Sequence, residues 1–245
     1  MTAGLSPESY LDHLRRSSDQ LLATEGSSID LPVAACPGWG LGRLVGHVGM
    51  VHRWAAAMMR EDPPVYIAPA DLERAPRDDT VWAWFGAGVP GLVEMLEGDL
   101  DARTFTWAGE QDRRWWLRRA AHETVVHAWD AQQAVGSTST IDPALAVDGI
   151  NEIFEVYYPN RFDAEAFGGA GETVHLHCTD VEGEWLVRYD PTAVHVGHEH
   201  AKGDVAVRGA AADLLLLLWG RQDPSACEVF GDRGLLDRVL TAGSF

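Results

Sequence analysis

The residues best suited to chemistry lie between Arg118 and Asp130, where the sequence reads RRAAHETVVHAWD. His122 and His127 are five residues apart, one more than the histidines of the zinc motif H-E-x-x-H. Five helical steps turn a side chain by about 140°, so these two imidazoles cannot bind one ion from a regular helix. Glu123 and His127 are four residues apart and share a helical face. The segment therefore predicts one carboxylate and one imidazole of a metal site whose third ligand lies elsewhere.

A second histidine-bearing helix is indicated nearer the N-terminus. Its apolar residues recur at helical spacing: Leu41, Leu44, Val45, Val48 and Val51. His47 lies on or beside this apolar stripe, whereas His52, which precedes an arginine, is expected nearer the polar edge. Together, His47, Glu123 and His127 would form a site with two imidazoles, one carboxylate and open positions. That donor set suits zinc and leaves room for water or a thiolate.

Alternatives to metal binding stay open for single residues. A histidine on an apolar helical face is more often a hydrogen-bonded core residue than a ligand, and this applies to His47 alone. Glu123 has apolar neighbours, and a buried carboxylate needs a partner or an ion. Asp130 follows His127 by three residues and could orient its imidazole. The sequence slightly favours a surface acid at Asp130.

Two kinds of secondary structure are expected to position these residues. Caps and breaks in the apolar pattern predict helices over residues 7–23, 41–60, 80–97, 113–135 and 143–158. Strands are predicted over 173–179, 184–189, 193–196 and 204–208, with helices over 210–219 and 232–240. The hydrophobic period changes from about 3.6 to 2 near residue 170. This change predicts an all-helical bundle before about residue 160 and a separate sheet-and-helix domain after about residue 170.

Several of these motifs together resemble one family. The segments at 37–39, 44–48 and 122–130, followed by 174–177, 183–187, 205–209, 214–221 and 229–232, resemble the mycothiol-dependent maleylpyruvate isomerase family of the DinB-like superfamily. The resemblance implies an α+β chain. Residues 1–160 would form a DinB-like metal-binding four-helix bundle, and residues 170–245 a small α/β C-terminal domain of the maleylpyruvate isomerase type.

The resemblance also implies a chemistry. It assigns a divalent metal, with zinc expected, to His47, Glu123 and His127, and it places an arginine of the C-terminal domain near the metal. Arg221, in the run Leu-Trp-Gly-Arg, is the match for that arginine. The bundle itself shows no obvious anion-binding group, since Arg43 and the other arginines of its helix lie off the apolar stripe. Mycothiol would be the thiol cosubstrate, activated for addition to a small electrophile.

The outcome of that chemistry is open between an isomerase of the maleylpyruvate type and a thiol S-transferase. Two further hypotheses remain. The first is a DinB-like metal- or small-molecule-binding protein without turnover, and the weaker one is a hydrolase that uses a metal-bound water. Addition of mycothiol would discriminate between them, because only a thiol-dependent enzyme should need it.

Composition limits the partners. The formal net charge is -18, from 37 acidic and 19 basic residues, and such a surface repels nucleic acids and anionic membranes. The apolar runs are too short to span a bilayer, and no N-terminal signal pattern is visible. We therefore expect a cytoplasmic protein, a monomer or weak homo-oligomer, whose partners are a small electrophile and mycothiol.

Cysteines and the remaining histidines carry weaker signals. Three cysteines are an odd and sparse set that does not indicate a disulfide framework, and Cys36 is interpreted as structural because nothing near it in sequence would activate its thiol. His195, His198 and His200 cluster in a predicted loop. Loop histidines are usually solvated, so a second metal site there is the less favoured interpretation.

Overall fold

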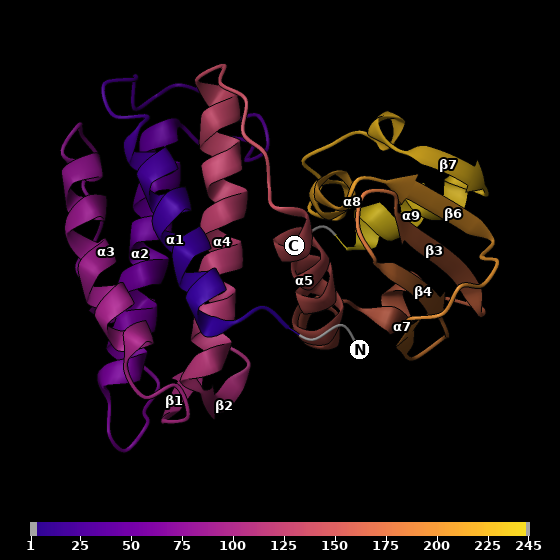
Figure 1. The fold of residues 1–245 in the computed structure, drawn as a ribbon, viewed down its shortest axis with the longest axis horizontal. Coiled ribbons are helices and arrows are strands. Elements are labelled where there is room, and N and C mark those ends of the chain that lie inside the picture. Colours follow the sequence, from indigo (N-terminus) through magenta and orange to yellow (C-terminus); the bar gives the residue numbers. More distant parts are fainter. Residues whose placement is uncertain (1–3, 244–245) are drawn as a thin grey trace. The chain divides into compact units, whose positions relative to one another are not determined.

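The computed structural model describes residues 4–243, whose contacts divide into two compact units. One unit spans Leu5–Thr140, and the other comprises the rest of the chain. The first is mainly helical and the second combines a sheet with helices, which confirms the expected fold class (Figure 1). The division follows Thr140, whereas the sequence placed it between residues 160 and 170. Helix α5 (Pro143–Glu152) accounts for the difference, since it packs on α8 (Ala211–Leu218) in the second unit.

A bundle of four helices forms the first unit. Its helices are α1 (Pro7–Leu22), α2 (Leu41–Arg60), α3 (Val81–Glu97) and α4 (Arg113–Ala134). Helix α1 packs mainly on α4, and α2 packs on both α3 and α4. Side-chain caps start two of the helices: Ser6 accepts from the Ser9 amide before α1, and Asp112 accepts from the Arg114 amide before α4.

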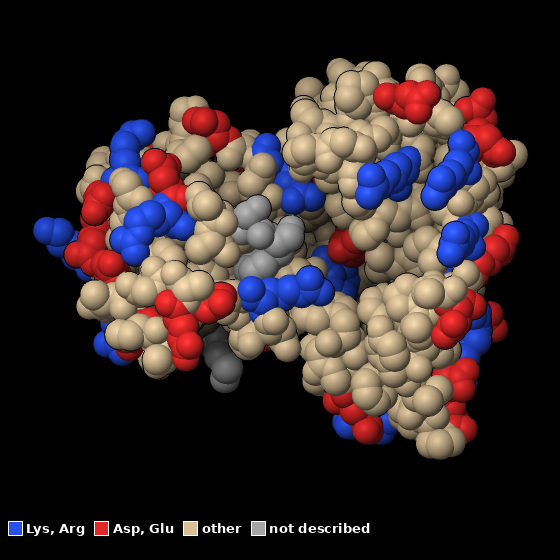
Figure 2. Space-filling view, turned by 180° about the vertical axis from the view of Figure 1, so that it is seen from behind, with Lys and Arg blue, Asp and Glu red and all other residues tan. Residues whose placement is uncertain are grey.

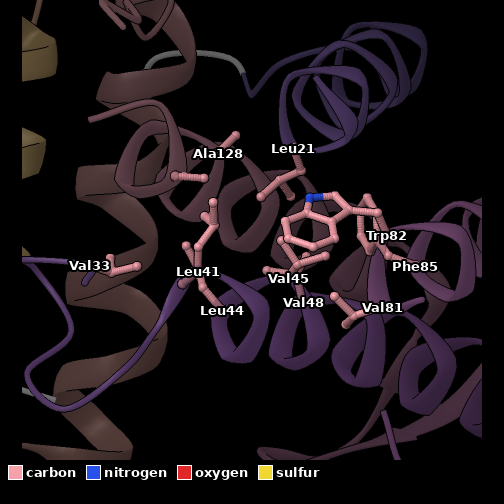
Figure 3. Close-up of a cluster of buried hydrophobic side chains, with 11 residues drawn as sticks. Leu21, Val33, Leu41, Leu44, Val45, Val48, Val81, Trp82, Phe85 and Ala128 are labelled. Atoms are coloured by element: carbon pink, nitrogen blue, oxygen red, sulfur yellow. The ribbon is translucent and has the colours of Figure 1, made fainter. Parts of the chain in front are cut away.

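The core of this unit joins α2 to α3 and α4. Its fully buried members are Leu21, Val33, Leu41, Leu44, Val45, Val48, Val81, Trp82, Phe85, Ala128 and Ala131 (Figure 3). The indole of Trp82 donates to the Thr24 hydroxyl at 3.0 Å, so its polar atom is satisfied inside the core. This packing fixes α2 against α4, the two helices that carry the residues expected to bind metal.

One expectation for the first unit is wrong, because it contains a β-hairpin. Strands β1 (Arg103–Thr106) and β2 (Gly109–Asp112) pair antiparallel. Gly109 takes a φ of 97°, which favours glycine in the turn, and Thr106 donates to its carbonyl at 2.7 Å. Four-residue strands are too short to show a clear period of two, and Trp116 of α4 holds the hairpin by donating to the Phe105 carbonyl at 2.9 Å.

The second unit is built on a five-stranded sheet. Its strands are β3 (Glu172–Cys178), β4 (Glu184–Tyr189), β5 (Val194–Gly197), β6 (Val205–Gly209) and β7 (Glu228–Gly231). They lie in the order β5-β4-β3-β6-β7, in which β3 and β6 are parallel and the other pairs are antiparallel. The helical segments besides α5 and α8 are a π-helical turn η2 (Ile153–Tyr157), α6 (Tyr158–Arg161), α7 (Ala164–Phe167), a 3-10 turn η3 (Pro224–Ala226) and α9 (Arg233–Ala242).

The two faces of this sheet differ in chemistry. Alternate side chains such as Val174, Leu176 and Val187 are fully buried, and α8 packs on β3 and β6. The opposite face carries polar side chains, including His175 and His177 of β3. Strand β3 is central in the sheet, so its polar side chains have strands on both sides.

The surface carries charges of both signs. On the face shown in Figure 2, basic side chains lie among acidic ones. Within the described residues, every helix is too short or too polar to cross a bilayer.

Candidate metal centre

Helices α2 and α4 bring together the three side chains that the sequence indicated as ligands. His47 Nε2 lies 2.9 Å from Glu123 Oε1, and His127 Nε2 lies 3.3 Å from the same oxygen. One potential ligand atom from each residue lies within 4.8 Å of the others. Glu123 and His127 share the face of α4 that their four-residue spacing requires, and His47 faces them from α2. Two imidazoles and one carboxylate thus converge as a three-ligand set.

Two further charged residues hold this set in place. Arg119, one turn before Glu123 on α4, donates to Glu123 Oε2 at 3.1 Å and is buried. Asp130 Oδ2 accepts from His127 Nδ1 at 2.9 Å. Asp130 is only 1% exposed, so it orients the imidazole and is not a surface acid. Because its Nδ1 donates to Asp130, His127 presents Nε2 to the site, as histidine ligands of metals do.

The charges of this cluster stabilise one another. Burial by itself would raise the pKa of Glu123, but the charge of His127, the hydrogen bonds of both imidazoles and the charge of Arg119 hold that pKa well below its usual range. Burial would likewise lower the pKa of His127, and the carboxylates of Glu123 and Asp130 instead hold it well above its usual range. Without a metal, an ion pair between Glu123 and His127 is therefore the favoured state.

The other two histidines of these helices lie outside the set. His52 is fully buried, and its Nε2 donates at 2.8 Å to the Thr124 hydroxyl, which itself donates to a backbone carbonyl. Burial lowers the pKa of His52 to about 4, so the ring is a neutral core group. His122 is buried with its ring edge against Tyr10 of α1, on a different face of α4 from His127, as the five-residue spacing requires.

The expected burial of the two α2 histidines is therefore wrong. The sequence placed His47 inward and His52 near the polar edge, yet the His47 side chain is 36% exposed and His52 is at 0%. The reason is tertiary: His52 packs beside Phe85 of α3 at a ring-centroid distance of 5.4 Å, whereas His47 borders a cavity. His47 still meets Glu123, at 2.9 Å, because α2 packs on α4.

That cavity has a volume of about 790 Å³ and belongs wholly to the first unit. His47 lines it together with Trp39, Arg43 and Arg77. The Arg43 guanidinium lies 4.5 Å above the Trp39 ring, and the same ring packs edge-on to His47 with centroids 5.0 Å apart. Arg43 and Arg77 thus lie at the cavity that His47 lines, where the sequence indicated no anion-binding group. Arg77 lies in a loop that no periodic pattern marks, and only the folded chain brings it to the same cavity as Arg43.

Comparisons with known proteins give the family. Residues 6–132 match the mycothiol maleylpyruvate isomerase N-terminal domain, and residues 144–238 match the MDMPI C-terminal domain. The chain belongs to the mycothiol maleylpyruvate isomerase family. The first match ends at residue 132 and the second begins at residue 144, and the structure divides between them, after Thr140.

Solved structures agree with this family at the level of fold. The crystal structure of the mycothiol-dependent maleylpyruvate isomerase matches with a TM-score of 0.64 and 17% identity, over 92% of this chain and 93% of that one. A histidine-to-alanine mutant of a mycothiol-dependent maleylpyruvate isomerase matches with a TM-score of 0.63 and 17% identity, over the same shares of each chain. No curated protein sequence matches the chain.

Cys36 lies closer to the ligand set than the sequence suggested. Cys36 precedes α2 and is half-buried, and its Sγ lies 3.9 Å from Asp130 Oδ2. Its Sγ, one imidazole nitrogen of His127 and one carboxylate oxygen of Asp130 all lie within 4.8 Å of one another. The sequence interpretation considered only the neighbours of Cys36 along the chain, which is why this proximity was missed.

Arg221 lies in the second unit, three residues after the end of α8 at Leu218. Its guanidinium donates to the Trp219 carbonyl at 2.7 Å and lies 5.8 Å from the centre of the Trp219 ring. The side chain is half-buried and is thus held against its own unit. Its expected role with substrate stays a prediction.

Proposed function

We propose that this protein is a metal- and mycothiol-dependent enzyme that activates a thiol for addition to a small electrophile, in an isomerisation of the maleylpyruvate type. The observation that carries the proposal is the convergence of His47, Glu123 and His127 as one ligand set, in which His47 also lines a cavity together with Arg43 and Arg77. Membership of the mycothiol maleylpyruvate isomerase family supplies the thiol and the class of substrate.

The donor set fits a divalent metal, and we propose zinc. Two imidazoles and one carboxylate are borderline and hard ligands that zinc accepts, and three protein ligands leave a position open for an exchangeable ligand. Asp130 fixes the His127 tautomer that a metal requires, and Arg119 binds the second oxygen of Glu123. A bound zinc ion would supply the positive charge that favours a thiolate over a thiol at neutral pH.

The residues of the cavity would position the substrate. We propose that Arg43 and Arg77 bind carboxylates of the substrate or of the thiol, because both line the cavity beside His47. Stacking on Trp39 restricts the Arg43 guanidinium, which lowers the entropy lost on binding. We propose Arg221 as a further residue that binds such an anion, and its place in the family's C-terminal domain supports this role.

Isomerase and S-transferase chemistry differ in the fate of the thiol. An isomerase returns the thiol after addition to and elimination from the conjugated double bond, and a transferase leaves it in the product. We propose the isomerase because of the family, and a thiol balance measures the difference. The three free cysteines support action in a reducing cytoplasm, where we expect a monomer or weak homo-oligomer.

The test is metal content and thiol-dependent turnover of the untagged protein. Wild type should consume maleylpyruvate only when both zinc and mycothiol are present, with the total thiol unchanged. His47→Ala should lose zinc at this site and lose turnover, whereas His195→Ala, an exposed histidine of the second unit, should keep both. Turnover without thiol, or no turnover in any zinc and thiol condition, would contradict the enzyme proposal. If His47→Ala keeps zinc at the bundle site while His52→Ala loses it there, the third ligand is wrongly assigned.

The cavity arginines need a separate test. Arg43→Met and Arg77→Met should each lower kcat/KM by about 30-fold while zinc content stays at the wild-type level. Arg103→Met is the matched control, since Arg103 pairs with Glu110 on the exposed hairpin. Normal kcat/KM in both cavity variants would remove these two residues from the substrate site.

A further inference from the structure

A second cluster of potential metal ligands lies in the sheet unit, outside the site described above. It consists of His175 and His177 of β3, Glu184 of β4 and His200 of the segment after β5. One potential ligand atom of each lies within 4.8 Å of the others. All four residues belong to the same compact unit, so the cluster forms independently of the bundle.

The strand geometry explains why three of these residues meet. His175 and His177 are two residues apart and therefore point to the same face of β3. Glu184 is the register partner of His177 on the antiparallel strand β4, so their side chains lie side by side on that face. Because β3 is flanked by β4 and β6, the histidines lie away from the sheet edges.

The fourth residue arrives on a segment that is held against the sheet. The Asp204 carboxylate accepts from the backbone amide and the hydroxyl of Thr173, both at 2.8 Å. Gly203 packs so closely on β3 that an added Cβ would lie 2.9 Å from the His175 amide nitrogen. At the other end, His198 Nδ1 lies 3.2 Å from the Glu184 carbonyl oxygen. His200, between these contacts, is thereby placed over the polar face.

Within the cluster, one buried nitrogen, Nε2 of His175, has no hydrogen-bond partner. Glu184 Oε1 is contacted by His177 Nδ1 and by His200 Nδ1, the latter at 2.7 Å. His175 is only 6% exposed, and its Nε2 has no hydrogen-bond partner and lies 4.0 Å from the same oxygen. A hydrogen-bonded cluster alone therefore leaves a buried lone pair or proton facing the centre of the group. A cation at this centre would satisfy it.

We propose that His175, His177, Glu184 and His200 form a second site for a divalent metal of the zinc class. Three imidazoles and one carboxylate suit zinc over calcium or magnesium, which prefer oxygen ligands. Four protein ligands complete a tetrahedral shell and leave no position for substrate. The site is therefore structural: it ties the segment 198–204 to the centre of the sheet.

This assignment differs from the histidine cluster that the sequence suggested. His200 belongs to both groupings, but His195 pairs with Asp190 and His198 contacts the Glu184 backbone instead. The partners of His200 come from β3 and β4, more than a dozen residues earlier in the chain. Sheet register, and not proximity in sequence, assembles the site.

Zinc titration of the full chain against a chromophoric chelator tests the proposal. The bundle variant His47→Ala should still bind one zinc ion. In that background, His177→Ala and His200→Ala should each weaken the remaining zinc by at least about 100-fold. His195→Ala is the matched control and should change affinity less than about threefold. His200 is 80% exposed in its side chain, so its removal leaves the fold intact.

Two further measurements read the site itself. Cobalt substituted into the His47→Ala variant should give the visible absorption of a tetrahedral nitrogen and oxygen site, and His200→Ala should lose it. Zinc should slow amide exchange in residues 198–204 of the His47→Ala variant. If the His47→Ala variant binds no zinc, or if His200→Ala and His195→Ala bind it equally, the proposal is overturned. Failure of thiol-dependent turnover would leave these zinc results unchanged, so the two proposals fail separately.

Discussion

At the residue scale, the burial of His52 makes the free energy of unfolding depend on pH. Its pKa is about 4 in the folded protein and near 6.5 when unfolded, because burial disfavours the charged ring. Its contribution is thus fully present above pH 6.5 and is lost as pH falls towards 4. We expect wild type to lose roughly 3 kcal/mol of unfolding free energy through this group over that range.

Urea denaturation at several pH values measures this loss. His52→Gln keeps a donor for Thr124 but cannot be protonated, so its stability should fall less steeply between pH 6.5 and 4. The comparison isolates His52 from Glu123, whose lowered pKa also makes stability fall in acid in both proteins. Equal slopes in the two proteins would show that His52 is not the responsible group.

Asp130 controls the metal through an imidazole. The change Asp130→Asn replaces the carboxylate that accepts from His127 Nδ1. We expect zinc at the bundle site to bind about 10- to 100-fold more weakly, with folding retained, because the ligand is less well oriented and less basic. A chelator competition measures the affinity, and Asp12→Asn on the exposed face of α1 is the control. An unchanged affinity would reduce Asp130 to a packing role.

Arg221 is the residue whose function the structure leaves as a prediction. The change Arg221→Met keeps the apolar stem and removes the charge, so zinc content and melting temperature should stay near wild type. If the guanidinium holds a substrate or thiol anion, its removal should cost about 2–4 kcal/mol of transition-state binding free energy, and kcat/KM should fall accordingly. Steady-state kinetics beside Arg188→Met, an exposed arginine of the same unit, decides this. Wild-type kinetics in Arg221→Met would remove Arg221 from the mechanism.

At the element scale, α2 and α3 pack closely because of a glycine. An added Cβ at Gly49 would lie 2.5 Å from the Trp84 ring, and Arg53 stacks on that ring at 3.5 Å, so the indole cannot move freely. Gly49→Ala should therefore destabilise the protein by about 1 kcal/mol, since strain outweighs the gain in helix propensity.

The matched substitution on α3 should behave differently. A Cβ at Gly91 would meet only the flexible end of Arg60, at 3.2 Å. Gly91→Ala should therefore be neutral or stabilise the protein by up to about 1 kcal/mol. Urea denaturation measures both variants, and a stabilised Gly49→Ala would show that Trp84 moves aside at little cost.

At the scale of the whole molecule, the two compact units predict where the chain can be cut. Residues 137 and 138 are exposed and lie outside regular structure between α4 and α5. Limited proteolysis should cut there first and leave two resistant fragments, because this segment joins the two compact units. Mass spectrometry identifies the fragments. A first cut between residues 160 and 170 would instead support the later boundary that the sequence suggested.

Local spacing and capping were sufficient for several features of this protein. The four-residue interval between Glu123 and His127 placed both on one face of α4, and Ser6 and Asp142 mark helix starts that the structure contains. The order of helices followed by strands indicated the fold class, because hydrophobic periods of about 3.6 and 2 reflect the geometry of each element. These features depend on contacts within a few residues, which the sequence displays directly.

Only the tertiary structure decided which elements face one another. It buried His52 and left His47 at a cavity, brought Arg77 to the same cavity as Arg43, and joined His200 to β3 and β4. It also paired two strands between α3 and α4 that were too short to show a period. Each outcome depends on packing between segments far apart in the chain. A side chain's own helix or strand sets its direction, but the neighbour it meets depends on how the elements pack.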